Sequence, residues 1–84
     1  MYSETDKQME EIKQVRSKQM RGYLYVTLKK TTPDGLARAV QRVLTLPVTG
    51  VFDEATINRL NRLALRSYPI FKARIEKYIR PAVN

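Results

Sequence analysis

The residue types that most often catalyse reactions are missing from this chain. It contains no His and no Cys, so the usual general base and the thiol nucleophile are both absent. Glu10 and Glu11 are adjacent and therefore point in different directions on a helix, which excludes a facing carboxylate pair of the glycosidase kind. The Asp and Glu residues show no Ca²⁺-loop spacing. We therefore expect a binding protein with no metal, no cofactor and no enzymatic activity.

Arginine side chains carry the chemistry that is left, which is the binding of anions. Arg59, Arg62 and Arg66 are spaced i, i+3 and i+7, and this spacing predicts one basic stripe on a helix. Asn58 and Asn61 accompany the stripe, and an Asn amide can bond adenine bidentately. The candidate nucleic-acid contacts add an i, i+4 pair from an earlier helix and comprise Arg38, Arg42, Asn58, Arg59, Asn61, Arg62 and Arg66.

The charge of the chain is large and unevenly distributed. Sixteen Lys and Arg against eight Asp and Glu give a formal net charge of +8. Half of the acids lie in the first eleven residues, whereas from Arg59 onward seven bases stand against Glu76 alone. Such a surface attracts polyanions, which include nucleic acid, anionic cell-wall polymers, acidic lipids and acidic proteins. A solvated basic surface without a specific ligand has the same composition.

The elements that must position these side chains are all predicted to be helices. The 84 residues are enough for one domain, residues 1–84, with a single core. Capping residues, prolines and apolar spacing together predict an all-α bundle of about four helices. The expected helices cover about residues 4–29, 33–45, 54–66 and 69–80, with a helix–turn–helix centred on residues 46–53.

The first of these helices has an ambiguous segment. Residues 23–28 alternate and include β-branched side chains, so they also fit a strand. No second strand is available to pair with them, and a lone strand leaves its backbone groups unsatisfied. We therefore expect a continuous helix that is bent at Gly22.

Apolar positions on the inner faces of the helices predict the core. Phe52 is expected to fill the space between the two helices that flank the turn. The predicted core comprises Leu24, Leu28, Leu36, Val40, Val43, Leu44, Val51, Phe52, Ile57, Leu60, Phe71, Ile75 and Tyr78.

The turn between the second and third helices carries the most specific motif in the chain. Residues 46–56 read Leu-Pro-Val-Thr-Gly-Val-Phe-Asp-Glu-Ala-Thr, and a Val-Gln pair at Val40 and Gln41 precedes them. This arrangement resembles the small helical peptidoglycan-binding domains of cell-wall hydrolases and phage endolysins, over about residues 36–65.

Five positions define how well the turn fits that family. Gly50, Phe52 and Thr56 match the family's turn. Thr49 stands where Asp is frequent, and Asp53 stands where Gly is frequent. The roles of these residues in the turn are architectural, because a glycine permits the chain reversal and polar side chains satisfy free N–H groups at the next helix start.

The resemblance implies a module that binds bacterial cell wall without cleaving it. The implied ligand is the glycan or the stem peptide of peptidoglycan, held in a shallow groove beside the turn, and the basic surface adds attraction to other anionic wall polymers. The implied ligand contacts are Gln41, Thr49, Gly50, Asp53 and Thr56.

Two further functions stay open. One is a small basic helix–turn–helix-like protein that binds DNA or RNA, although the turn is longer than the usual three to four residues. The other is a phage-type adaptor or inhibitor that binds an acidic host protein. Its first helix, with Met9, Ile12 and Met20, would pair with a partner helix or with a second copy as a homodimer, unless these residues complete the core.

The N-terminal sequence is polar and shows no signal peptide. The longest apolar stretches are too short to span a bilayer. We therefore expect the protein in the cytoplasm or in a phage virion, which is consistent with a phage origin.

Overall fold

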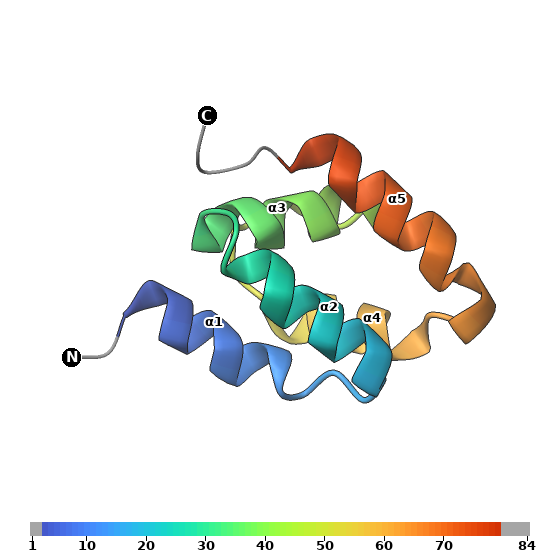
Figure 1. Cartoon of the computed structure of the whole chain (residues 1–84), viewed down its shortest axis with the longest axis horizontal. Coiled ribbons are helices and arrows are strands. Elements are labelled where there is room, and N and C mark those ends of the chain that lie inside the picture. Colours follow the sequence, from blue (N-terminus) through green and yellow to red (C-terminus); the bar gives the residue numbers. More distant parts are fainter. Residues whose placement is uncertain (1–2, 80–84) are drawn as a thin grey trace.

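Every element of secondary structure in the computed structural model, which describes residues 3–79, is a helix (Figure 1). The helices are α1 (Glu4–Ile12), α2 (Lys18–Leu28), α3 (Pro33–Val43), α4 (Glu54–Arg62), the short 3-10 helix η1 (Leu65–Ser67) and α5 (Tyr68–Tyr78). The predicted all-α class is confirmed over these residues, with five α helices in place of about four. None of the described helices is long and apolar enough to cross a membrane.

The prediction of one continuous helix over 4–29 is wrong, because the segment divides into α1 and α2. The Ser17 hydroxyl accepts the backbone N–H of Met20 at 3.2 Å, so Ser17 is the N-cap of a new helix. Val15, in the turn between the two helices, is completely buried. The bend expected at Gly22 is therefore misplaced, since Gly22 lies inside α2.

Helix starts agree with the capping residues in the sequence. Ser3 caps α1 and forms a reciprocal capping box with Asp6. Thr32 is the N-cap of α3, and Asp53 is the N-cap of α4, where its carboxylate accepts the N–H of Thr56. Residues 23–28 are helical, as preferred. Local capping chemistry is thus sufficient to place these boundaries.

Helix ends differ more from the prediction than helix starts do. The predicted ends are residues 45 and 66, whereas α3 ends at Val43 and α4 ends at Arg62. Thr45 adopts the left-handed backbone conformation, φ 59°, and the N–H of Leu46 donates to the carbonyl of Gln41 at 2.9 Å. A β-branched residue is strained in this conformation. After Arg62 the chain is extended at Leu63, ψ 132°, and continues through η1. α5 ends at Tyr78, because Ile79 is extended, ψ 133°, while the predicted end at residue 80 lies outside the described residues.

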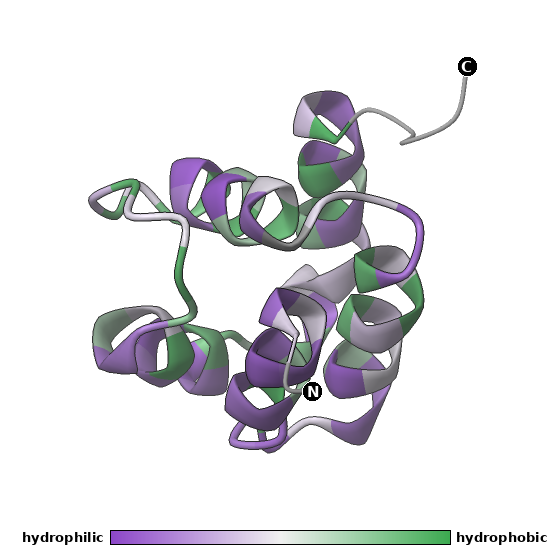
Figure 2. Ribbon diagram, turned by 90° about the vertical axis from the view of Figure 1, so that its left-hand side faces the viewer, coloured by the Kyte–Doolittle hydropathy of each residue, from purple (hydrophilic) through white to green (hydrophobic). Residues whose placement is uncertain are grey.

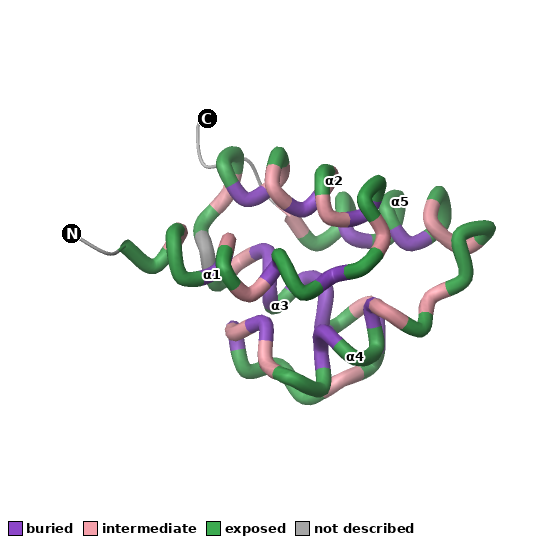
Figure 3. Tube along the Cα trace, turned by 90° about the horizontal axis from the view of Figure 1, so that it is seen from below, coloured by how far each residue is buried: buried purple, intermediate pink, exposed green. Residues whose placement is uncertain are grey.

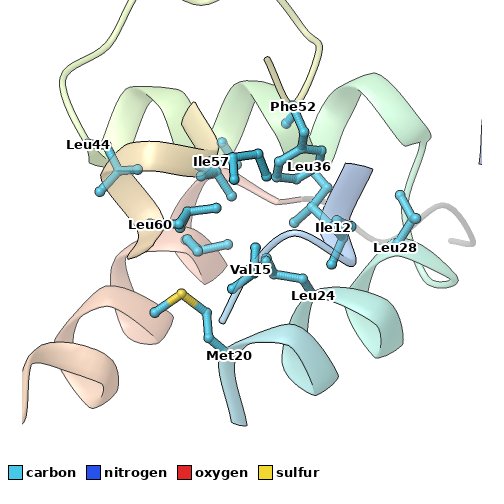
Figure 4. Close-up of a cluster of buried hydrophobic side chains, with 14 of the residues drawn as sticks. Ile12, Val15, Met20, Leu24, Leu28, Leu36, Leu44, Phe52, Ile57 and Leu60 are labelled. Carbon is cyan, nitrogen blue, oxygen red and sulfur yellow. The ribbon is translucent and has the colours of Figure 1, made fainter. Parts of the chain in front are cut away.

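The core forms where α1, α2 and α3 pack against one another and α5 packs against α3. Side chains from all of these helices and from α4 meet in one cluster (Figure 4). Buried positions recur along the inner side of each helix (Figure 3), and hydrophilic and hydrophobic residues share each helix (Figure 2). The confirmed core residues are Leu24, Leu28, Leu36, Val40, Leu44, Phe52, Ile57, Leu60, Phe71 and Ile75.

Three of the predicted core positions are corrected. Val43 and Val51 are only partly buried, and Tyr78 is 54% exposed. Ile12 and Met20, which were candidates for pairing with a partner helix, are 0% and 2% exposed and belong to the core. Met9 is partly buried and packs against the same core, so the side chains of Ile12 and Met20 are not available on the surface for a partner or a second copy.

Candidate functional site

The five residues of the implied wall-binding site do lie together, around the buried amide of Gln41. Its Oε1 accepts hydrogen bonds from the backbone N–H groups of Thr49 at 2.9 Å and Gly50 at 3.0 Å. Its Nε2 donates to the Val51 carbonyl at 2.7 Å, to Thr49 Oγ1 at 2.9 Å and to Thr56 Oγ1 at 3.1 Å. We call Gln41, Thr49, Gly50, Asp53 and Thr56 the Gln41 cluster.

The remaining polar groups of the cluster bond within the protein too. Asp53 Oδ1 accepts the Thr56 hydroxyl at 2.6 Å and the Thr56 N–H at 3.0 Å, and Asp53 Oδ2 accepts the Thr49 hydroxyl at 3.3 Å. Gly50, with φ 81°, has its carbonyl bonded by Gln8 Nε2 from α1 at 3.2 Å. These contacts hold the turn in place, so the cluster has a structural role whatever it binds.

These hydrogen bonds make the stability of the turn depend on pH. The hydroxyl of Thr56 is the main reason why the pKa of Asp53 lies below its ordinary value, although partial burial acts in the opposite direction. A carboxyl group with a lowered folded pKa adds stability above its unfolded pKa of about 4 and loses it as the pH falls through the folded pKa.

We therefore expect Asp53→Asn to lower the free energy of unfolding at pH 7 by about 0.3–1 kcal/mol, the usual contribution of an acid at a helix N-terminus. As the pH falls through the lowered folded pKa of Asp53, the difference from wild type should shrink towards zero. Urea denaturation between pH 2 and 7 measures this. Glu54→Gln, next to the same helix start, controls for net charge, and a difference that is independent of pH would contradict the assignment.

The predicted arginine stripe is broken in the structure. Arg59 and Arg62 lie on α4, but α4 ends at Arg62, so Arg66 lies in η1 and is not on the same helix face. Arg38, on α3, is 3.5 Å from the carboxylate of Asp34 in an exposed ion pair. The i, i+3, i+7 spacing therefore does not produce one continuous basic face.

The two asparagines have different surroundings. Asn58 is exposed on α4. Asn61 accepts the backbone N–H of Arg16 at 2.8 Å and donates to the carbonyl of Gln14 at 3.1 Å. Both ends of its amide thus hold the turn between α1 and α2, which accounts for its position without a base contact.

A basic groove, which the sequence did not predict, lies where α3, α4 and α5 approach one another. It consists of two hollows of about 340 and about 330 Å³ that share Val43, Thr45 and Arg74. The first is also lined by Leu44, Arg59, Leu63, Ser67, Ile70 and Phe71. The second is also lined by Arg42, Lys77 and Tyr78.

Four cations from three helices surround this groove, and none of the described residues that line it is an acid. Arg42 comes from α3, Arg59 from α4, and Arg74 and Lys77 from α5, and all four are exposed. The ion pairs found within residues 3–79 are those of Lys13 with Glu10 and of Arg38 with Asp34, so none of the four has a carboxylate partner there. Within the described part of the chain, no ion pair compensates their positive charge.

Two of the four cations of the basic groove were identified from the sequence. Arg42 and Arg59 are among the candidate contacts, whereas Arg74 and Lys77 were counted only as charge. Their i, i+3 spacing on an amphipathic helix is the pattern that would have identified them. This spacing does not show that α5 packs against α3, which brings Arg74 and Val43 to the same hollow.

A third hollow of about 360 Å³ lies on the other side of α5, against α2. It is lined by Lys30, Lys72 and the acid Glu76, and Lys72 Nζ lies 5.4 Å from the centre of the Tyr23 ring. Burial raises the pKa of the Tyr23 hydroxyl. Because its charges are mixed, this hollow is less suited to a polyanion than the basic groove.

Comparison with protein-family models, with curated proteins and with solved structures finds no match to this chain.

Proposed function

We propose that this chain is a non-enzymatic module that binds nucleic acid through the basic groove. The observation that carries the proposal is the gathering of Arg42, Arg59, Arg74 and Lys77 from three helices around two hollows that share Arg74, with no acid among the described residues that line them. A chain that was only made soluble by charge would mix signs on such a surface. Cations without protein partners are the groups that replace counterions along a phosphate backbone.

The floor of the groove favours nucleic acid over a wall polymer. Leu63, Ile70 and Phe71 line one hollow, and Tyr78 lines the other, so apolar and cationic side chains line the same groove. Nucleic acid offers the matching combination, because its phosphates are charged and its bases have apolar faces. A charged sugar or polyol polymer offers the charge without the flat apolar faces.

Cell-wall binding is the second proposal, and one observation supports it. The residues that the resemblance implies form a single cluster at the turn, with Thr49 exposed and Asp53 partly exposed. Retention on purified sacculi at about 300 mM salt, where electrostatic attraction is largely screened, tests it. Loss of retention in Thr49→Val, with retention kept in Asn58→Ala, would place the contact at the cluster.

The first test of nucleic-acid binding is the double variant Arg59→Ala/Arg74→Ala. We expect its affinity for a labelled 20-nucleotide DNA to fall roughly ten- to thirtyfold at 100 mM salt, because two phosphate contacts are lost. The slope of log K against log salt should become shallower by about 1.4 on a single strand or about 1.8 on a duplex. Fluorescence anisotropy from 50 to 300 mM salt measures both quantities.

The matched control is Arg62→Ala/Arg66→Ala, which removes the same charge from residues that do not line the groove. It should change affinity less than threefold and leave the slope unaltered. Equal losses in the two double variants would show attraction to net charge and would contradict a defined groove. No binding to DNA or RNA by the wild type would reject the function itself.

A further inference from the structure

One face of α5 contributes a row of side chains to the basic groove, and this row includes apolar and aromatic residues as well as a cation. Ile70, Arg74 and Tyr78 are spaced i, i+4 and i+8, so they lie on one face of the helix, and all three line the groove. The row spans about 12 Å at the rise of an α-helix.

Tyr78 is the aromatic member of this row and is unusually open. It is 54% exposed, whereas Tyr23, Tyr25 and Tyr68 are partly buried. Around it lie the cations Arg42, Arg74 and Lys77, which line the same hollow. An exposed aromatic ring among cations is the arrangement on which bases of a single strand stack while their phosphates are neutralised.

The shape of the groove fits a strand better than a double helix. Its hollows, about 340 and about 330 Å³, are near the lower end of the roughly 300–1,000 Å³ found for ligand pockets, a size that suits a single base in each. A duplex is instead read by a protein element that enters its major groove, which is about 12 Å wide. The α4 face expected to do so lacks Arg66, and its Asn61 amide is bonded to the α1–α2 turn.

We infer that the basic groove binds single-stranded nucleic acid, with a base stacked on Tyr78 and with Arg42, Arg74 and Lys77 contacting the neighbouring phosphates. This inference rests on the proposed nucleic-acid function and specifies its substrate class. It assigns Tyr78 a role that requires its exposure, in place of the core position expected from helical spacing.

The test compares a 12-nucleotide oligo(dT) with a 12-base-pair duplex in anisotropy titrations. Wild type should bind the single strand at least tenfold more tightly. Tyr78→Ala should weaken single-strand binding about fivefold or more without changing the salt slope, because it removes stacking and no cation. Tyr78→Phe keeps the ring and should stay within about twofold of wild type. On a strand with abasic sites the loss caused by Tyr78→Ala should disappear.

A second measurement does not depend on the stability of the alanine variant. The chain has no Trp, so Tyr78→Trp places a single indole in the groove. Its fluorescence should be quenched on adding oligo(dT) and not on adding the duplex. Equal affinity for both DNA forms, no loss in Tyr78→Ala and no quenching would overturn the inference, while a retained Arg59/Arg74 effect would leave the proposed function standing. Absence of all nucleic-acid binding would overturn both.

Discussion

Phe52→Ala is expected to lower the free energy of unfolding by about 3–5 kcal/mol, the usual cost of emptying a buried aromatic site. Phe52 is 2% exposed and lies in the core cluster with Leu36 and Ile57, between the turn and the helices on either side (Figure 4). A chain of this length is stable by only about 4–13 kcal/mol, so the variant should be close to unfolding or unfolded at 37 °C.

Urea denaturation monitored by circular dichroism measures the effect. Phe52→Leu, which keeps most of the volume, should lose less than the alanine variant. Val48→Ala is the control from the same turn, because Val48 is 43% exposed and should cost no more than about 0.5 kcal/mol. A loss below about 1 kcal/mol in Phe52→Ala would mean that Phe52 does not fill the space between the helices.

Gln41→Met should have an effect of similar size, about 3–5 kcal/mol, for a different reason. Methionine keeps the length of the side chain but makes none of its hydrogen bonds. The N–H groups of Thr49 and Gly50 would lose their acceptor, whereas the carbonyl of Val51 would keep the Asp53 N–H at 2.8 Å. Each unpaired buried group costs about 1–3 kcal/mol. Gln19→Met, at an exposed position on α2, is the control and should change stability by about 0.5 kcal/mol or less.

Gln41→Glu tests the accepting and the donating ends of the Gln41 amide separately. One carboxylate oxygen can still accept from the turn, but the other would face the Val51 carbonyl, where the amide donates at 2.7 Å. The buried acid is stable when it is protonated, because burial raises its pKa and the protonated form can donate. The variant should therefore lose stability relative to wild type as the pH rises from about 4 to 7. A constant difference over that range would argue against donation by the Gln41 amide.

Local signals in the sequence were sufficient for the fold class and for most helix starts. Asp53 caps α4 because the N–H of Thr56, three residues along the chain, is free, and Pro33 starts α3 directly after Thr32. Both relations are visible in the sequence. The division of the predicted first helix into α1 and α2 is not visible in the local sequence, because Asn61 contacts the α1–α2 turn from 45 residues away. Helical spacing in the sequence cannot predict a contact between residues so far apart in the chain.

The candidate site shows the same limit. The motif identified which residues gather at the turn, because Gln41, Gly50 and Thr56 belong to one local segment, but it did not show that their polar atoms bond one another. Helical spacing placed Tyr78 on the inner side of α5 but could not show where the neighbouring helix stops. α3 ends at Val43, and Tyr78 lines a hollow there with a largely exposed ring.

The hydrogen bonds from α1 to the turn determine how this sequence can be divided and recombined. Gln8 bonds the carbonyl of Gly50, and Asn61 holds the carbonyl of Gln14, across 42 and 47 residues of chain. Segment 36–65, moved alone into another chain, would lack Gln8 and Gln14 and with them both of these hydrogen bonds. A gene fusion or a recombination event of that kind would leave the glycine turn without one of its supports. We therefore expect the helix–turn–helix to be less stable when it is inherited without α1 than with it.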